Sequence, residues 1–306
     1  HFELDPAAAC RISRIVRKER INILHAHTAH ALSLGILVKI LNPGLILIAV
    51  RRVDFSILHS LGSRWKYSNK LVNKIVCISH KIRQVLLTDG IPSQKLITIH
   101  SGIDLTRFLD YDRQFDIRAE YGIPASHLLI GTIAALVGHK DYPSLLKAAS
   151  LIISEIPDIT FLALGDGPLV SRLNQLHSEL NLGSRFIFCG FQSRVGDYLH
   201  NFDIYVMASR KEGLGTSILD ALSVGLPVVA TRAGGIPEVI THGHNGLLVE
   251  KENPAALAAA LSNLIRDTDL RKKFAENALV SAREFSIENT VSRNMNLYRE
   301  LLNHAN

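Results

Sequence analysis

Short apolar runs recur along this 306-residue chain and alternate with amphipathic segments. Ten such runs occur, at residues 21–27, 45–51, 74–79, 96–102, 128–136, 159–167, 185–190, 202–209, 227–232 and 245–250. Most are rich in Ile, Val and Leu, and such runs are typical of parallel strands that are buried on both faces. Helical patterns separate them, as at 142–155, 216–223 and 254–266. The alternation predicts an α/β protein with doubly wound, Rossmann-like sheets.

The alternation breaks once, between residues 103 and 127, where the chain is polar and carries charges of both signs. We place a domain boundary in this segment, since boundaries fall where polar linkers join compact units. We therefore expect a first lobe at 1–107, a second lobe at 108–285 and a C-terminal helix at 286–306. Ligands of open α/β sheets bind beyond the carboxyl ends of the strands, so the two lobes are expected to face one cleft.

Composition and charge narrow the class of partner. Hydrophobic residues make up 47% of the chain, no apolar run is long enough to cross a bilayer, and the formal net charge is +6. This charge favours anionic partners such as nucleotides, acidic glycans or phospholipid surfaces. Basic and aromatic residues are nowhere densely interleaved, which argues against nucleic acid. Cys10, Cys77 and Cys189 lie far apart in apolar contexts, which predicts buried free thiols in a reducing compartment such as the cytoplasm.

The segment SRKEGLGTSILDALSVGLPVVAT, residues 209–231, contains only two acids, Glu212 and Asp220. A predicted strand precedes it, and a helix is predicted to begin at its Thr-Ser pair. Glycines in the turn permit unusual backbone angles, and the amides at the start of a helix form an anion site. This turn and helix start comprise Gly213, Leu214, Gly215, Thr216 and Ser217.

Three roles are open for Glu212 and Asp220 on chemistry alone. They could be an acid/base pair, metal ligands, or acceptors for the hydroxyls of a sugar. No His or third carboxylate is spaced to complete a metal shell, so we predict no metal site.

Two further groups of polar residues follow strands of the first lobe. HAHTAHA (25–31) contains three histidines, but it lacks the co-ligands of a zinc site. VRRVDFS (50–56) contains Arg51, Arg52 and Asp54, which could hold an anionic acceptor or simply solvate a strand end. We favour acceptor binding, because both arginines follow a strand end on the cleft side.

The run EGLGTSILDALSVGLPVVAT resembles the donor-site signature of the retaining glycosyltransferases of family 4, which have the GT-B fold. In that signature a Glu is followed by seven residues and a second Glu, and Asp220 stands at the second position. GTIAALVGHKDYPSLLKA (131–148) resembles the block that carries an Arg and a Lys for the donor diphosphate. Lys140 matches the Lys, whereas Ala135 stands at the Arg position, and Arg210 is a candidate to compensate. LALGDGPL and FCGFQSRVGDYL resemble the nucleoside side of the site.

The resemblance implies a metal-independent, retaining hexosyltransferase. Its co-substrate is a nucleotide-diphospho-sugar, with no other cofactor, and its acceptor is a glycan or lipid-linked molecule of cell-envelope polysaccharide or lipopolysaccharide synthesis. Glu212 would bond hydroxyls of the transferred sugar, Asp220 the ribose, and Lys140 the diphosphate, while His27 would lie near the sugar. The other donor residues implied are Gly165, Asp166, Val195 and the turn from Gly213 to Ser217. A cytoplasmic protein with peripheral contact with the inner membrane is expected.

The first lobe is expected to be truncated. A GT-B first lobe begins with a strand and a Gly-rich turn, and no such turn precedes residue 21. About two βα units are therefore expected to be missing. The C-terminal helix, which in this family crosses back onto the first lobe, carries a predicted apolar stripe of Val291, Met295, Tyr298 and Leu302.

Two other functions stay open. One is a sugar-nucleotide epimerase of the same fold, and the other is a nucleotide-binding fragment without catalysis. A dehydrogenase is disfavoured, because GDGPL is only part of the dinucleotide fingerprint and lies in the second lobe.

Overall fold

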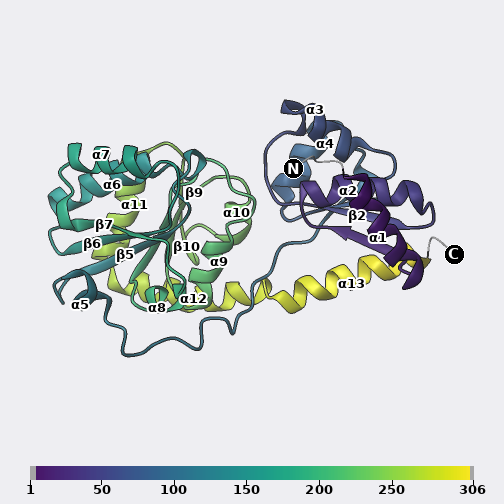
Figure 1. The fold of residues 1–306 in the computed structure, drawn as a ribbon. Helices are drawn as coiled ribbons and strands as arrows, with labels where there is room; N and C mark the ends of the chain where they lie inside the picture. Colours follow the sequence, from purple (N-terminus) through teal and green to yellow (C-terminus); the bar gives the residue numbers. More distant parts are fainter. Residues whose placement is uncertain (1–4, 304–306) are drawn as a thin grey trace. The chain divides into compact units, whose positions relative to one another are not determined.

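The computed structural model describes residues 5–303, and the chain forms two units (Figure 1). Unit 1 is the chain up to Ser101 together with the chain from Glu288 onward, and unit 2 is Gly102–Ile287. The lobes predicted at 1–107 and 108–285 divide the chain close to these points, and the C-terminal helix from Glu288 groups with unit 1. None of the helices between residues 5 and 303 combines the length and the apolar character that a membrane crossing needs.

Unit 1 is built around a four-stranded parallel sheet with helices between the strands. Its elements are α1 (Pro6–Lys18), β1 (Ile23–Ala26), α2 (Ala29–Leu41), β2 (Ile46–Arg51), η1 (Ile57–His59), α3 (Leu61–Ser68), β3 (Lys74–Cys77), α4 (His80–Thr88), η2 (Ser93–Lys95), β4 (Leu96–Thr98) and α13 (Ile287–Asn303). The strand order is β1-β2-β3-β4, so the described strands of this sheet are wound in one direction. β2 is buried along its whole length, as its apolar run predicts.

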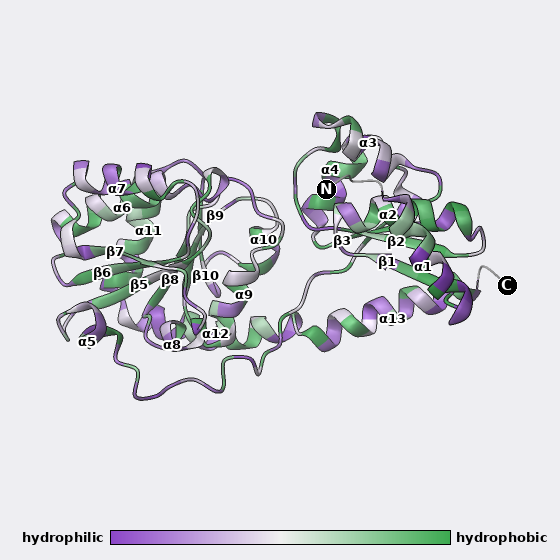
Figure 2. Ribbon diagram, in the orientation of Figure 1, coloured by the Kyte–Doolittle hydropathy of each residue, from purple (hydrophilic) through white to green (hydrophobic). Residues whose placement is uncertain are grey.

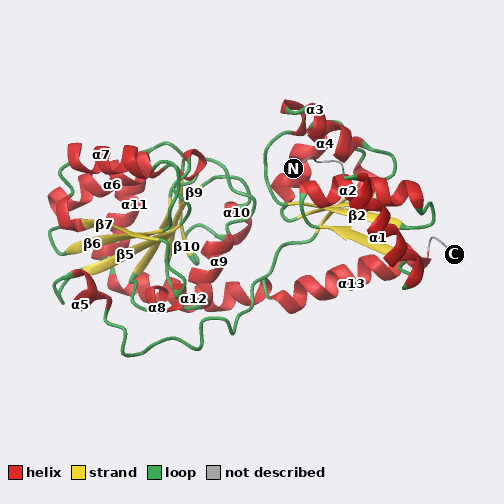
Figure 3. Ribbon diagram, viewed as in Figure 1, coloured by secondary structure: helices red, strands yellow, loops and turns green. Residues whose placement is uncertain are grey.

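Unit 2 is a six-stranded parallel sheet covered by helices on both faces (Figure 3). Its elements are α5 (Ile117–Tyr121), β5 (Leu128–Ile133), η3 (Gly138–Lys140), α6 (Tyr142–Glu155), β6 (Ile159–Leu164), α7 (Val170–Glu179), η4 (Gly183–Arg185), β7 (Phe186–Gly190), α8 (Val195–Leu199), β8 (Ile204–Met207), α9 (Thr216–Ser223), β9 (Val228–Thr231), α10 (Ile236–Val239), β10 (Gly246–Val249), α11 (Pro254–Arg266) and α12 (Thr268–Glu284). The strand order is β10-β9-β8-β5-β6-β7. The winding therefore reverses between β8 and β5, which is the doubly wound arrangement that the sequence predicts.

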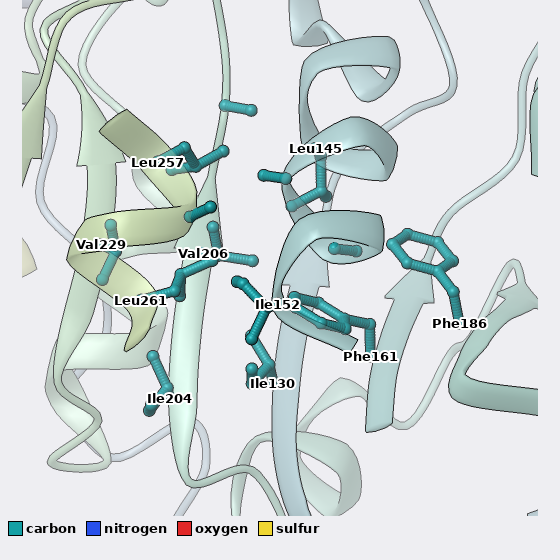
Figure 4. Close-up of a cluster of buried hydrophobic side chains, with 14 of the residues drawn as sticks. Ile130, Leu145, Ile152, Phe161, Phe186, Ile204, Val206, Val229, Leu257 and Leu261 are labelled. Carbon is teal, nitrogen blue, oxygen red and sulfur yellow. The ribbon is translucent and has the colours of Figure 1, made fainter. Parts of the chain in front are cut away.

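The main core of unit 2 lies between the sheet and the helices α6 and α11 (Figure 4). In this cluster Ile152 of α6 lies beside Phe161 of β6, whereas Leu257 and Leu261 of α11 lie beside Val206 of β8 and Val229 of β9. Hydropathy follows the same division, with apolar strands inside and polar helix surfaces outside (Figure 2). Burial of this apolar area is the main force that holds the sheet and its helices together.

The predicted strands are confirmed, since each of the ten apolar runs contains one strand. The predicted helices at 142–155, 216–223 and 254–266 are confirmed at both ends. The polar segment 103–127, predicted as the domain boundary, contains the short helix α5. The Asp116 side chain caps α5 by accepting from two backbone amides, and Gly122 ends it with a φ of +62°.

Two predictions about individual side chains are wrong. Cys10 is exposed, although Cys77 is buried as predicted. On α13, Val291 and Met295 are 53% and 42% exposed, whereas Leu297 is buried. The other two residues of the predicted stripe, Tyr298 and Leu302, are half-buried, and the Tyr298 hydroxyl lies 2.6 Å from Nδ1 of His25.

Candidate functional site

Two loops of unit 2 begin where the winding of its sheet reverses. β5 and β8 are paired neighbours, although about seventy residues separate them in the sequence. The loop after β5 leads into η3, which ends at Lys140, and the loop after β8 contains Glu212. The carboxyl edge of the sheet at such a reversal is where α/β proteins bind ligands.

Lys140 and Glu212 form an ion pair at this reversal. The Lys140 ammonium donates a hydrogen bond to Glu212 Oε2. The two side chains are 16% and 15% exposed, so solvent screens the pair only in part. Ser209 Oγ lies 3.4 Å from the same oxygen, and Thr231 Oγ1 donates to the Ser209 carbonyl at 2.5 Å. The fold thus brings together two residues that the sequence assigned to one site.

The turn between Glu212 and α9 presents backbone amides. Gly215 precedes the helix with a φ of +91°, a left-handed conformation that glycine adopts without strain. It has no side chain to cap the helix, so the first amides of α9 can donate to a ligand. The neighbouring predicted residues differ in exposure: Leu214 is buried, Gly213 and Ser217 are half-buried, and Thr216 is exposed.

The loop after β9 fixes the backbone of Glu212. The Gly235 amide donates to the Glu212 carbonyl oxygen at 3.0 Å. A Cβ atom on Gly234 would lie 1.7 Å from that oxygen, and the φ of Gly234 is +52°. Only glycine fits this position. Sequence reasoning did not assign this role, and the signal for it is the Gly pair at 234–235.

Asp220 is a half-buried acid with a buried, unsatisfied oxygen. Burial raises the pKa of its carboxyl from 3.8 to about 6, and the Arg107 guanidinium opposes part of this shift. Its Oδ1 atom is buried and has no hydrogen-bond partner among residues 5–303. Because a buried polar atom without a partner destabilises the fold, a ligand that donates a hydrogen bond here would relieve that penalty.

Tyr205 is a residue of this site that sequence reasoning missed. It is fully buried on β8, and its hydroxyl lies 3.3 Å from both the amide nitrogen and the carbonyl oxygen of Ile133 at the end of β5. Burial raises the pKa of the phenol, and the nearby Asp220 and Glu212 charges raise it further. The neutral hydroxyl therefore joins the two strands below the ion pair. A single phenol within the apolar run FDIYVMAS was its only signal.

The predicted donor residues of the β6 and β7 loops lie at the same carboxyl edge of the sheet. Gly165 and Asp166 follow β6, and Val195 is the first residue of α8. The Gly165 amide donates to the Gly190 carbonyl at 2.8 Å, and the Asp166 carbonyl accepts from Leu136 at 3.0 Å. The side chain of Asp166 is exposed and accepts a hydrogen bond from the next amide in the chain.

A polar cavity of about 440 Å³ opens beside Val195. Its lining comes from residues between 107 and 112 and from residues 193–197. Asp197 organises this wall, because its carboxylate accepts from Arg194 Nε at 2.7 Å and from the Asp112 amide at 2.9 Å. Arg107, whose positive charge lowers the pKa of Asp220, also lines the cavity. The same guanidinium is therefore near both the acid and the cavity.

Arg210 was a candidate to replace the cation missing at Ala135. Its Nη2 atom donates to the Gly138 carbonyl at 2.6 Å, and its Nη1 atom pairs with Glu252 at 3.3 Å. Its backbone amide also donates to the His139 carbonyl at 2.8 Å. Arg210 therefore holds the short helix that ends at Lys140.

The predicted residues of unit 1 lie after β1 and β2. His27 is exposed, and its Nδ1 accepts from Arg52 Nη2 at 3.3 Å. Burial, and then the Arg52 charge, lower the pKa of His27. Asp54 is half-buried. His25 lies with its ring 4.4 Å from that of His27, and burial lowers its pKa to about 4, so it stays neutral where it meets Tyr298.

Arg51 is the last residue of β2 and is buried, and its role in acceptor binding stays a prediction. Its residue is only 7% exposed. The guanidinium donates to the Phe55 carbonyl at 2.6 Å and lies over the ring of Tyr67, 4.9 Å from the centroid. The guanidinium packs inward from the end of a fully buried strand, and its Nε atom is buried without a hydrogen-bond partner among residues 5–303.

Two families cover nearly the whole chain. Residues 113–280 match the family Glycosyl transferases group 1, and residues 1–107 match Glycosyltransferase Family 4.

Individual relatives extend over most of the chain and about four fifths of their own length. The N-acetyl-alpha-D-glucosaminyl L-malate synthase of Bacillus anthracis is 28% identical over 305 residues, 97% of this chain and 80% of the relative. The UDP-Gal:alpha-D-GlcNAc-diphosphoundecaprenol alpha-1,3-galactosyltransferase of Escherichia coli is 22% identical over 97% of this chain and 80% of its own. The crystal structure of Anabaena HepE in complex with UDP-glucose matches with a TM-score of 0.86 at 22% identity, covering 95% of this chain and 82% of that one.

Proposed function

Because this chain belongs to the group 1 glycosyltransferases, we propose that it transfers a sugar from a nucleotide-diphospho-sugar to a glycan or lipid-linked acceptor, with retention of the anomeric configuration. The observation that carries the proposal is the ion pair of Lys140 and Glu212 at the reversal of the unit 2 sheet. A cation, a carboxylate and a set of free helix amides at one sheet edge match the chemistry of a sugar diphosphate.

Lys140 and the first amides of α9 would hold the diphosphate. Negative charge grows on the diphosphate as the glycosidic bond breaks, so a fixed cation there stabilises the transition state more than the ground state. Glu212 would accept hydrogen bonds from hydroxyls of the transferred sugar. In the structure the two side chains bond each other, and a bound donor would offer a diphosphate oxygen to Lys140 and sugar hydroxyls to Glu212.

Asp220 would accept a hydrogen bond from the ribose of the donor. Its buried Oδ1 has no partner within the described part of the chain, and a ribose hydroxyl would satisfy it. The cavity beside Val195 would take the base, because it lies between Arg107 and α8 at the same edge. Asp is one methylene shorter than the Glu usual in this family, so the ribose must sit closer to α9 or reach Asp220 through water.

We propose a UDP-sugar as the donor to test first. The names of the Escherichia coli relative and of the Anabaena complex both contain UDP, and the former acts on a diphosphoundecaprenol-linked sugar. This supports a lipid-linked acceptor in cell-envelope synthesis. We also propose a cytoplasmic location with peripheral contact with the inner membrane, and a role for His27 near the transferred sugar and for Arg52 and Asp54 near the acceptor.

The reaction is proposed to be metal-independent and to follow a front-face course. The leaving diphosphate would help to deprotonate the acceptor hydroxyl, while Lys140 and the α9 amides neutralise its charge. Retention is tested by NMR analysis of the product anomer, and an inverted product would contradict this mechanism.

Substitution of Lys140 by Ala tests the role of the ion pair. We expect the rate of transfer from UDP-sugars to fall about a hundredfold or more, the size of effect seen when one charge-stabilising group is removed. Lys147→Ala, an exposed lysine on α6, is the matched control and should keep its rate. Full activity of Lys140→Ala would refute the proposed role.

The two alternatives give different outcomes. An epimerase would convert the donor without any acceptor, so incubation with the donor alone distinguishes it. A non-catalytic nucleotide-binding protein would show a thermal shift with UDP, GDP, ADP or CMP sugars, but no transfer to any acceptor.

A further inference from the structure

The charge of the chain is divided unevenly between the two units. Unit 1 contains 17 Lys and Arg against 7 Asp and Glu, a net charge of +10. Unit 2 contains 17 against 21, a net charge of −4, and the two values add to the +6 of the whole chain. The excess positive charge therefore lies on unit 1, which favours an anionic partner for that unit.

One stretch of unit 1 has cations and no acid at all. No Asp or Glu occurs between Asp54 and Asp89. The stretch contains six basic residues, which are Arg64, Lys66, Lys70, Lys74, Lys81 and Arg83. It includes η1 and α3, and α3 lies at the periphery of unit 1 (Figure 1).

Large apolar side chains protrude into solvent from the same stretch. Leu61 is 85% exposed, the highest value among the exposed large hydrophobic residues of the described chain. Trp65 is 46% and Leu58 is 54% exposed. Leu61, Arg64 and Trp65 are three and four residues apart on α3, so they share one helix face. Tyr67, on the other side of the helix, is only 2% exposed, so that side packs against the rest of the chain and the side with Leu61 and Trp65 faces solvent.

A groove runs along this face and has cations beside it. Its volume is about 540 Å³, and Leu61, Arg64, Trp65, Ser68, Asn69 and Lys70 line it. We call Leu58 and these six residues the α3 face. It combines apolar side chains that gain by leaving water with cations that gain by meeting phosphate.

We propose that the α3 face docks unit 1 on the anionic surface of a lipid bilayer. Leu58, Leu61 and Trp65 enter the boundary between headgroups and acyl chains, while Arg64 and Lys70 bind lipid phosphates. This gives a location to the peripheral membrane contact proposed above, and it rests on that part of the proposal.

The chemistry of the α3 face favours a bilayer over other anionic partners. Trp and Leu beside Lys and Arg are the composition of interfacial helices, and Trp is the side chain that prefers the headgroup level. A nucleic acid would gain from the cations but would leave the protruding Leu61 in water. Because the helix is short and few side chains insert, the docking is reversible and weakened by salt.

Trp65 is the single Trp of the chain, so its fluorescence reports directly on the α3 face. The full chain is titrated with vesicles of phosphatidylcholine containing about a third phosphatidylglycerol, and with vesicles of phosphatidylcholine alone. We expect a blue shift of the emission with the anionic vesicles, quenching by brominated lipid, and reversal at high salt. The neutral vesicles should give a much smaller change.

Two variants locate the contact. Leu61→Ser keeps Trp65 and should weaken binding to the anionic vesicles by about tenfold, as expected from the loss of one buried leucine. Leu279→Ser, on α12 of unit 2, removes a leucine that is 44% exposed and should bind as the parent does. Both variants should keep the thermal shift with UDP, which shows that they are folded and separates this test from that of the donor site.

Three results would overturn the proposal. The first is that the protein sediments with the anionic vesicles while the Trp65 emission stays unchanged, which would mean that another surface binds them. The second is that Leu61→Ser and the parent bind the vesicles equally well. The third is a blue shift that grows with protein concentration without vesicles, because it would assign the α3 face to a second copy of the chain.

Discussion

Replacing Asp220 by Asn is expected to stabilise the protein and to weaken donor binding. The acid is half-buried, and its buried Oδ1 has no partner among the residues between 5 and 303. Asn has nearly the same shape and no charge. The substitution therefore removes a partly buried charge that opposes folding, and it replaces the charged acceptor proposed for the ribose with a neutral, weaker one.

The pKa of Asp220 sets the size of the effect on stability. Burial raises it from 3.8 to about 6, about two pH units, and each unit corresponds to about 1.4 kcal/mol. Because the folded chain holds this proton more tightly than the unfolded chain, stability is lost as the pH rises from 3.8 through 6 and is constant above that range. Above pH 6 we therefore expect Asp220→Asn to raise the free energy of unfolding by about 1–3 kcal/mol, the lower part of the range allowing for partial exposure.

Urea unfolding at pH 5 and pH 8 measures this difference without donor. The gain from Asp220→Asn should be larger at pH 8 than at pH 5, whereas Asp166→Asn, an exposed acid of the same site, should show no such dependence. UDP titration should show binding about tenfold or more weaker in Asp220→Asn, as expected when a hydrogen bond to a charged group is lost. Affinity of the parent should also fall as the pH drops below about 6.

The reasoning is refuted if Asp220→Asn is no more stable than the parent at pH 8. It is also refuted if its gain in stability is the same at pH 5 and pH 8. Unchanged affinity for UDP would leave the burial argument intact but remove the proposed ribose contact.

Two other changes test the geometry and the chemistry of the site. Gly234→Ala places a Cβ atom 1.7 Å from the Glu212 carbonyl oxygen, and this clash must move the loop by more than 1 Å. Transfer activity should therefore fall about a hundredfold. The control is Gly243→Ala, which is also at positive φ but has open space around it and should lose only stability. Normal activity of Gly234→Ala would show that the Glu212 backbone need not be fixed. Treatment with EDTA should leave the transfer rate unchanged, because Lys140 and the α9 amides are proposed to neutralise the diphosphate. A loss of transfer activity that added Mg²⁺ or Mn²⁺ restores would contradict the metal-independent mechanism.

The amino-acid sequence by itself determined the local elements of this protein. Each strand and the main helices of unit 2 could be predicted, since an apolar run, a cap or a glycine turn is a property of neighbouring residues. The helix after Glu212 is an example, because Gly215 before it and Gly225 after it mark its two ends. Lys140 and Asp220 could be assigned on the same local basis, each from a short stretch that resembles a known motif.

The tertiary structure alone decided which of these residues meet and which are buried. Lys140 bonds Glu212 only because β5 pairs with β8, a pairing between strands distant in the sequence. Arg51 turns inward, Tyr205 joins two strands, and Leu61 is left in solvent, although nothing in their local patterns distinguishes them. Sheet order and burial come from long-range packing, in which each residue's environment is supplied by segments far along the chain. For that reason the sequence predicts the parts of the proposed donor site, and the fold assembles them.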